Sequence, residues 1–205
     1  MRLVARLRAD REFADVRVTP LLVVAKALLL ALHCHPEINA SWDDEAREIA
    51  YKHYINLGIA TATPLGLVMP NIKDAHRLSL MELAQELTAL TLTARSGKTV
   101  PSDLADGTIT ITNVGAFGID SGTPILNRGE SAILGFGDVR EHPWVHKGKI
   151  KVRQVTQLAL SVDHRLVERP RLASPRRRRE DPGRALPVHG VGLTPAREVE
   201  PLTPK

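Results

Sequence analysis

Residues 107–118 read GTITITNVGAFG, and this stretch decides the fold. From Thr108 to Thr112, threonine alternates strictly with isoleucine before Asn113 and Val114 follow, which is the period of a strand that buries one face. Gly115 and Gly118 follow at once and predict a tight turn, where glycine can supply the positive φ that other residues avoid. The sequence therefore predicts a sheet that contains residues 108–114 as a strand.

Two helices are predicted from their starts and their apolar stripes. Thr19 is suited to be an N-cap, with Pro20 at the first helical position, and this helix should end near residues 33–35, before the next proline. Ser79 begins the second helix, residues 79–95, with Glu82 three positions on as a capping box. Residues 2–13 also have helical spacing but begin without a cap.

Further strands are expected on both sides of residues 108–114. The expected ranges are 38–43, 48–51, 56–63, 65–72, 131–139 and 151–162. Because helices and strands are intermixed without regular βαβ alternation, we expect an α/β fold, a two-layer sandwich with a mixed sheet, and not a Rossmann sheet.

Composition limits the function classes. Of the 205 residues, 43% are hydrophobic but only 3% are aromatic, so the core must be aliphatic. The net charge of +5 is uneven, because residues 168–205 hold nine basic and five acidic residues, and residues 1–167 hold 19 and 18. A balanced body does not favour nucleic acid as a partner. The absence of a long apolar run or a secretory signal and the single Cys34 favour a cytoplasmic protein without membrane contact.

The chain changes character after Val167. Seven of its 14 prolines fall in residues 168–205, and no apolar period continues there. We therefore expect a domain at 1–167 and a disordered Arg/Pro-rich tail at 168–205. The run Pro175 to Arg179 could suggest nucleic-acid binding, but no aromatic stacking residue lies beside it, so we set that interpretation aside.

The strand expected at 151–162 is followed by Asp163, His164 and Arg165. One interpretation is a polar strand end with solvated charges. The other is a general base, because the unperturbed histidine pKa near 6.5 suits proton transfer at physiological pH. His33, Cys34 and His35 are also close together, but no fourth ligand is in view, so we expect no metal site.

Several blocks of the sequence carry a resemblance to a known family. SVDHRLV at 161–167 resembles the signature Asp-His-Arg-x-x-Asp-Gly of the acyltransferase component of 2-oxo acid dehydrogenase complexes. PEINASWDDE, INLGIATATPLGLVMPNIKDAHRLSLMELAQEL, GTITITNVGAFGID and GTPILNRGESAILGFG resemble further blocks of that family in the same order. The resemblance covers about residues 2–167.

The resemblance implies a chloramphenicol acetyltransferase-like fold and a homotrimer that builds a larger hollow core. It also implies acyl transfer between a lipoyl group and coenzyme A, with the decarboxylase and dihydrolipoamide dehydrogenase components as partners. Acetyl and branched-chain acyl groups both fit the blocks. We expect the lipoyl group on a domain absent from this chain.

The resemblance also assigns roles to residues. His164 would be the general base, and the hydroxyl of Thr112 would stabilise the oxyanion. Glu168 stands where the signature has its last carboxylate. Asp163 and Arg165 would hold the strand end, while Asn113 and Gly115 would shape the turn beside a site that lies between neighbouring subunits.

The sequence departs from the signature at residues 168 and 169. Glu168 and Arg169 replace Asp and Gly, and Pro170 follows where the family continues into a long amphipathic helix. We interpret this abrupt change as a reading-frame shift near codon 168. Two alternatives to the acyltransferase stay open: a catalytically dead remnant or scaffold subunit of the same fold, and a stand-alone chloramphenicol-type acetyltransferase.

Overall fold

The structure is a computed structural model that describes residues 1–64 and 66–167, so the expected tail at 168–205 lies outside the described residues. Its helices are α1 (Arg2–Ala9), α2 (Pro20–Cys34), α3 (Leu80–Arg95) and α4 (Pro101–Leu104), with 3₁₀ turns at Arg11–Phe13, Pro36–Asn39, Ala75–Arg77 and Gly115–Phe117. Its strands are β1 (Ala40–Asp43), β2 (Glu48–Tyr51), β3 (Leu57–Thr63), β4 (Gly66–Val68), β5 (Asn71–Ile72), β6 (Ile109–Asn113), β7 (Ala132–Phe136), β8 (Arg140–His146), β9 (Lys149–Val155) and β10 (Leu158–Val162).

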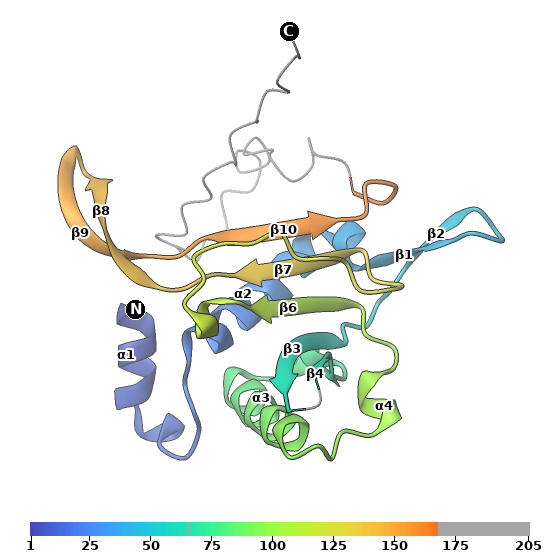
Figure 1. Ribbon diagram of the computed structural model, residues 1–205, viewed down its shortest axis with the longest axis horizontal. Helices are drawn as coiled ribbons and strands as arrows, with labels where there is room; N and C mark the ends of the chain where they lie inside the picture. Colours follow the sequence, from blue (N-terminus) through green and yellow to red (C-terminus); the bar gives the residue numbers. More distant parts are fainter. Residues whose placement is uncertain (65, 168–205) are drawn as a thin grey trace, which may run out of the picture. The chain divides into compact units, whose positions relative to one another are not determined.

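The central sheet is mixed, as expected. Strands β10, β7, β6, β3 and β4 lie in that order, and β5 pairs with β3 to complete six strands. Strands β3, β6 and β7 are parallel, whereas β10, β4 and β5 are antiparallel to their neighbours. Two separate hairpins, β1–β2 and β8–β9, project from this sheet (Figure 1). The α/β class and the mixed sheet are therefore confirmed.

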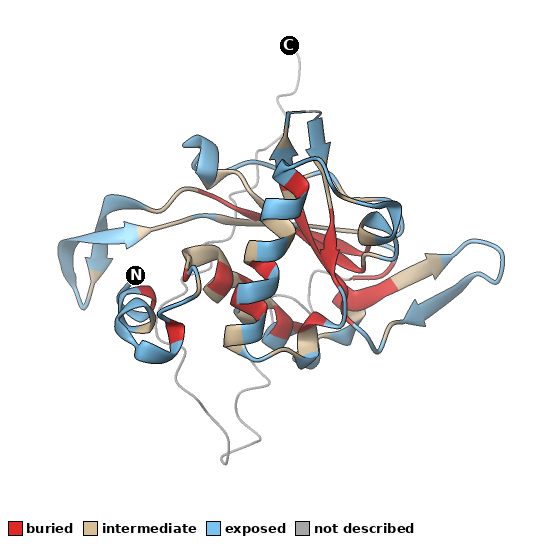
Figure 2. Ribbon diagram, turned by 90° about the horizontal axis from the view of Figure 1, so that it is seen from below, coloured by how far each residue is buried: buried red, intermediate tan, exposed pale blue. Residues whose placement is uncertain are grey.

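Alternation along β6 determines which face of the sheet is covered. Ile109 and Ile111 are fully buried and share one apolar cluster with Leu22 of α2 and Leu83 of α3. Burying each such side chain stabilises the fold by about 1.5–3 kcal/mol. Figure 2 shows the buried residues gathered where the helices meet the strands. Because side chains alternate, the threonines of β6 point to the other face.

The helix starts follow the predicted capping chemistry. The Thr19 hydroxyl accepts a hydrogen bond from the Leu22 N–H at 3.3 Å. Ser79 and Glu82 form the capping box, with the Glu82 N–H donating to Ser79 Oγ at 3.2 Å and the Ser79 N–H donating to Glu82 Oε2 at 2.7 Å. The bond from the Ser79 N–H to the ionised carboxylate, and to a smaller extent the Ser79 side chain, lower the Glu82 pKa.

The expected single strand at 151–162 is wrong. The strand is interrupted at Thr156 and Gln157, so that β9 belongs to the projecting hairpin and β10 to the central sheet. The Thr156 hydroxyl donates to the Gly137 carbonyl at 2.8 Å, and the Gly137 N–H donates to the Gln157 carbonyl at 3.0 Å. These side-chain and backbone bonds fix the junction, and apolar alternation alone does not reveal such a change of sheet.

The other differences between the expected and the observed strands and helices have local causes. Pro70 lacks an N–H, and the strand expected at 65–72 is divided there into β4 and β5. The strand expected at 38–43 begins at Ala40, because a 3₁₀ turn follows Pro36. Strand β8 was not expected, since Pro143 lies in its middle; an exposed two-stranded hairpin tolerates proline there. The helix expected at 2–13 is interrupted after Ala9, and α4 is an additional short helix.

A buried carboxylate lies beside the central strand. Glu130 is 6% exposed, and its Oε1 accepts hydrogen bonds from the Thr110 hydroxyl and the Asn127 side-chain amide, both at 2.9 Å. Its Oε2 is buried and has no hydrogen-bond partner among the described residues. Loss of hydration raises the pKa of Glu130, and the two hydrogen bonds only partly oppose that rise.

This raised pKa gives a stability prediction. The pKa of Glu130 is higher in the folded chain than its unfolded value of 4.5. As pH rises between these two pKa values, the unfolded state ionises more readily than the folded state, so the free energy of unfolding falls. Glu130→Gln removes the ionisation. We expect urea unfolding at pH 4 to 8 to show the variant gaining stability relative to the unmodified chain as pH increases.

The matched control is Glu86→Gln on the exposed side of α3. It should change stability little at any pH, as surface substitutions do. If the free energy of unfolding of the Glu130→Gln variant and of the unmodified chain changed equally with pH, ionisation of Glu130 would not be the cause of the pH dependence.

Candidate active site

The first half of the candidate site lies at the carboxyl end of β6. Thr112 and Asn113 are half-buried there, and Thr112 is aligned with Ala60 of β3 and Gly135 of β7. With only an alanine and a glycine beside it, the Thr112 hydroxyl lies on a part of the sheet face with little side-chain bulk. It forms no hydrogen bond with another described residue, so it is free to donate to a ligand.

The second half is the turn that follows β10. The Asp163 N–H donates to the Ser131 carbonyl at 2.8 Å, and the Asp163 carbonyl accepts from the N–H groups of Leu166 and Val167 at 3.0 and 3.1 Å. Leu166 and Val167 are 9% and 0% exposed, so both ends of the turn are fixed. His164 is carried at the exposed apex of this rigid turn.

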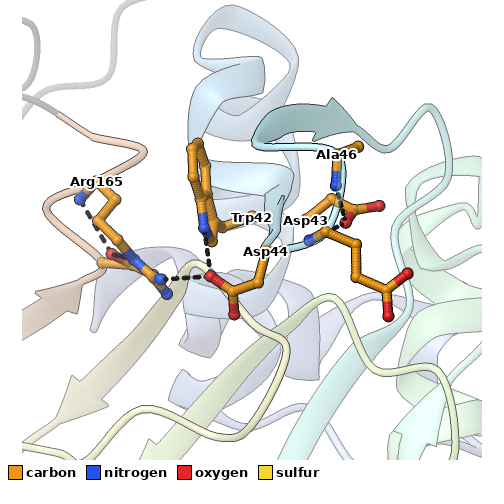
Figure 3. A network of polar contacts seen from close by, with 7 residues as sticks. Trp42, Asp43, Asp44, Ala46 and Arg165 are labelled. Carbon is orange, nitrogen blue, oxygen red and sulfur yellow. Dashed lines mark hydrogen bonds and ion pairs between the residues drawn. The ribbon is translucent and has the colours of Figure 1, made fainter.

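Arg165 connects this turn to the β1–β2 hairpin. Its guanidinium donates to Asp163 through Nη2 at 2.7 Å and through Nε at 3.1 Å, which lowers the pKa of Asp163 and raises that of Arg165. It also lies 3.6 Å from an Asp44 oxygen and 5.8 Å from the centre of the Trp42 ring. The Trp42 indole N–H donates to the same Asp44 oxygen at 2.6 Å (Figure 3).

Within one chain the two halves lie at opposite ends of the sheet. Thr112 is level with Gly135 on β7, whereas the last residue of β10, Val162, is level with Ala132. His164 lies two residues further on. From strand rise and spacing, Thr112 and His164 are roughly 15 Å or more apart. In Figure 1, β6 and β10 point in opposite directions. One copy therefore does not bring the two groups together.

Glycine is required at position 115 for a different reason from the expected positive φ. Its φ is not positive; the left-handed residue of this turn is Gly118, at φ 73°. A Cβ on Gly115 would instead lie 2.6 Å from Asp138 N and from the Gly137 carbonyl group. Close approach of two backbones therefore requires glycine at 115. Glu168, the third expected catalytic residue, lies outside the described residues.

Sequence reasoning missed two groups near the site. Trp42 and Asp44 lie in the block PEINASWDDE, which was used to predict a short strand and to recognise a resemblance, and the order Trp-Asp-Asp predicts no contact with residue 165. Glu130 was passed over because it precedes the apolar run SAILGF. In both cases the signal was a polar residue in a block otherwise explained by strand pattern.

Other kinds of site receive no support from the described part of the chain. No three histidine, cysteine or acidic side chains are grouped there as a metal ion would need. Likewise, none of the helices at 1–64 and 66–167 combines the length and the hydropathy required for a membrane span.

Comparisons with known proteins identify the family of this chain. The family described as 2-oxoacid dehydrogenases acyltransferase (catalytic domain) matches residues 1–174. The dihydrolipoyllysine-residue acetyltransferase component of the pyruvate dehydrogenase complex of Acholeplasma laidlawii is 42% identical over 157 residues, which are 77% of this chain and 29% of that protein. The chain thus spans under a third of that relative's length.

Two solved structures are also similar to this chain. Azotobacter vinelandii dihydrolipoamide acetyltransferase, studied for the role of a serine, a histidine and an asparagine in its catalytic mechanism, gives a TM-score of 0.76 at 33% identity, covering 81% of this chain and 68% of that one. The cubic core of a pyruvate dehydrogenase multienzyme complex gives 0.75 at 33% identity with the same coverage.

The contact at Gly115 gives a prediction about the turn beside the site. Gly115→Ala places a methyl group against the backbone of Gly137 and Asp138, so we expect a loss of about 1–3 kcal/mol in the free energy of unfolding. The measurement is chemical denaturation. Gly122→Ala is the control, because nothing lies within 4 Å of its added Cβ. Equal effects at both positions would contradict the close-approach explanation.

Proposed function

Because the chain belongs to the family of 2-oxoacid dehydrogenase acyltransferase catalytic domains, we propose that it moves an acyl group between dihydrolipoamide and coenzyme A. The observation that carries this proposal is the pair of polar groups on fixed elements, His164 on its rigid turn and the Thr112 hydroxyl at the end of β6. These match in residue type and order the histidine and the hydroxyl residue of the Azotobacter vinelandii protein.

The chemistry requires a base and a hydrogen-bond donor. His164 takes the proton from the thiol of coenzyme A, and the thiolate attacks the carbonyl carbon of the acyl-dihydrolipoamide thioester. The carbonyl oxygen becomes an oxyanion, to which the Thr112 O–H donates; one such bond is worth about 3 kcal/mol. The intermediate then expels the dihydrolipoamide thiolate, which takes the proton from His164. The reverse reaction uses the same groups.

The active site is formed by two copies of the chain. Register places Thr112 and His164 at opposite ends of one sheet, too far apart to act on one thioester. A neighbouring copy that brings its His164 turn to the β6 end supplies the missing half. A cyclic assembly, a homotrimer within a larger core, gives every copy both neighbours it needs. The similarity to a cubic core supports this arrangement.

We propose acetyl as the acyl group, since the relative from Acholeplasma laidlawii is named an acetyltransferase component. The same name supports pyruvate dehydrogenase-type partners, that is, a decarboxylase and a dihydrolipoamide dehydrogenase. The lipoyl group would be delivered on a separate domain. The free, exposed Cys34 is compatible with the cytoplasm that we propose as the location.

Whether this chain catalyses the reaction or is an inactive remnant depends on residue Glu168. In the Azotobacter vinelandii protein the asparagine follows the histidine by four positions, which is the spacing from His164 to Glu168. Glutamate is longer and charged, and Arg169 replaces the glycine of the signature. We propose Glu168 as a further catalytic-site residue, whose altered chemistry lowers the rate without removing the base.

The test is acyl transfer by mixed assemblies. His164→Ala and Thr112→Val, each alone, should lose about 100-fold or more of the rate of thiol exchange between acetyl-dihydrolipoamide and coenzyme A. Co-expressed in equal amounts, the two variants should recover about a quarter of the unmodified rate, because random neighbours pair one intact Thr112 with one intact His164.

Four results separate the possibilities. Recovery in the mixture supports a site shared between copies. Single variants that lose activity without recovery in the mixture contradict the shared site. An unmodified chain that assembles but transfers no acetyl group contradicts the acyltransferase and supports the scaffold alternative, whereas activity with chloramphenicol but not with dihydrolipoamide supports the stand-alone acetyltransferase.

A further inference from the structure

The segment before β7 lies between the two halves of the candidate active site. In the sheet, β7 separates β6, which carries Thr112, from β10, which is followed by His164 (Figure 1). Glu130 and Ser131 directly precede β7 and are 6% and 0% exposed. Each of them forms a hydrogen bond toward one side, so this buried segment contacts both the strand of Thr112 and the turn of His164.

Glu130 connects the segment to β6. Its Oε1 accepts a hydrogen bond from the Thr110 hydroxyl at 2.9 Å, and Thr110 is fully buried. Thr110 and Thr112 share one face of β6, because side chains alternate along a strand. Gly107 leaves the space for this contact, since a Cβ at position 107 would lie 2.9 Å from Glu130 Oε1. The carboxyl group therefore fills a place beside the strand of the proposed oxyanion donor that only a glycine at 107 keeps open.

Ser131 connects the same segment to the turn of His164. Its carbonyl accepts a hydrogen bond from the Asp163 N–H at 2.8 Å, and this bond helps to join the turn to the sheet. Because Ser131 follows Glu130 directly in the chain, a displacement of the Glu130 side chain moves the backbone that holds Asp163. The placement of the turn therefore depends on how Glu130 is held.

The carboxyl group also organises the segment that carries it. The Asn127 side-chain amide donates to Glu130 Oε1 at 2.9 Å, and the Glu130 N–H donates to the Asn127 carbonyl at 3.2 Å. Lys52 donates to the Gly129 carbonyl at 3.4 Å from outside the segment. Loss of the carboxyl group would take this acceptor away from the Thr110 hydroxyl and the Asn127 amide, and a buried donor without an acceptor destabilises its surroundings.

A neutral side chain fits this place better than a charged one. Glu130 Oε2 is buried and has no hydrogen-bond partner among the described residues. Loss of hydration raises the pKa of Glu130 and outweighs the opposing hydrogen bonds from Asn127 and Thr110. Lys52 supplies the positive charge that acts on Glu130, and its effect is smaller still. Glutamine has the same shape, keeps an acceptor oxygen and cannot ionise, so Glu130→Gln should hold the segment as the protonated carboxyl group does.

We propose that Glu130 is a positioning residue for acyl transfer, whose side chain sets the placement of β6 at Thr112 and of the turn at His164. Glu130 is enclosed, so it acts through these two groups and not by contact with a thioester. The catalytic consequence rests on the proposed function. The link from Glu130 to the turn does not, because hydrogen bonds within one chain form it. Since Thr112 and His164 of one copy serve two neighbouring sites, one Glu130 supports half of each.

The first measurement reads the link without any reaction. Amide hydrogen exchange of the full chain, followed by mass spectrometry, compares residues 163–167 with α2 as an internal reference. Glu130→Ala removes the acceptor, so we expect exchange at residues 163–167 to be faster by about 10-fold, with α2 little changed. Glu130→Gln at pH 6 should exchange at nearly the rate of the unmodified chain. Glu86→Ala, which removes an exposed carboxyl group of α3, is the matched control and should change neither segment.

The second measurement is the rate of acetyl transfer to coenzyme A by the assembled chain. Glu130→Ala should lower kcat by about 10- to 100-fold while KM changes little, because misplaced reacting groups slow the chemical step without removing substrate contacts. Glu130→Gln should restore most of kcat. As pH rises through the folded pKa of Glu130, the rate of the Glu130→Gln variant relative to the unmodified chain should increase, because only the unmodified chain then acquires the buried charge.

The link is overturned if exchange at residues 163–167 is unchanged in Glu130→Ala, if α2 exchanges faster to the same degree, or if Glu130→Gln behaves like Glu130→Ala. Faster exchange in the turn with an unchanged kcat contradicts the positioning role and leaves the acyltransferase proposal intact. Conversely, an unmodified chain that transfers no acetyl group contradicts the proposed function, while hydrogen exchange still decides whether Glu130 holds the turn.

Discussion

The pairing of β10 with β7 is the constraint on which the rest of the structure depends. It is antiparallel, whereas β6 and β7 are parallel, so the carboxyl ends of β6 and β10 must face opposite ways. Each end carries one of the two polar groups to which the proposed acyl transfer assigns a role. No side-chain rotation brings Thr112 to His164, because the distance between them is set by backbone hydrogen bonds. Under the proposed function, the register of one sheet therefore makes acyl transfer a property of an assembly of copies.

Ion pairs are likewise found at both ends of the central sheet. Asp163, Arg165 and Asp44 fix the turn beside His164 through ion pairs in which the Asp163 to Arg165 contact is the shortest, at 2.7 Å. At the other end, Arg140 pairs with Asp138 at 2.8 Å and with Asp120 at 3.3 Å where the β8–β9 hairpin begins. These exposed pairs contribute little stability individually, typically about 0–1 kcal/mol each. Their effect is to set where neighbouring segments point.

The sequence predicted those parts of the fold that local physics determines. Thr19 and Ser79 fix helix starts by hydrogen bonds within three residues, and TITIT alternates because Ile109 and Ile111 face the helices. Prediction failed where distant contacts decide. The break at Thr156 depends on Gly137, and Pro143 concealed β8. Of the candidate site, His164 and Thr112 were found through resemblance, while the contact of Trp42 with Arg165 required the fold.

Val167 is the last described residue, and it is fully buried, with its N–H bonded to the Asp163 carbonyl. The apolar cluster of the described residues thus extends to the position just before the family signature is lost at Glu168. Under the proposed function, a substitution at position 168 changes a residue of the active site, while the cluster that ends at Val167 keeps its own side chains. A lineage could then lose turnover and still retain the apolar residues that hold the sheet to its helices.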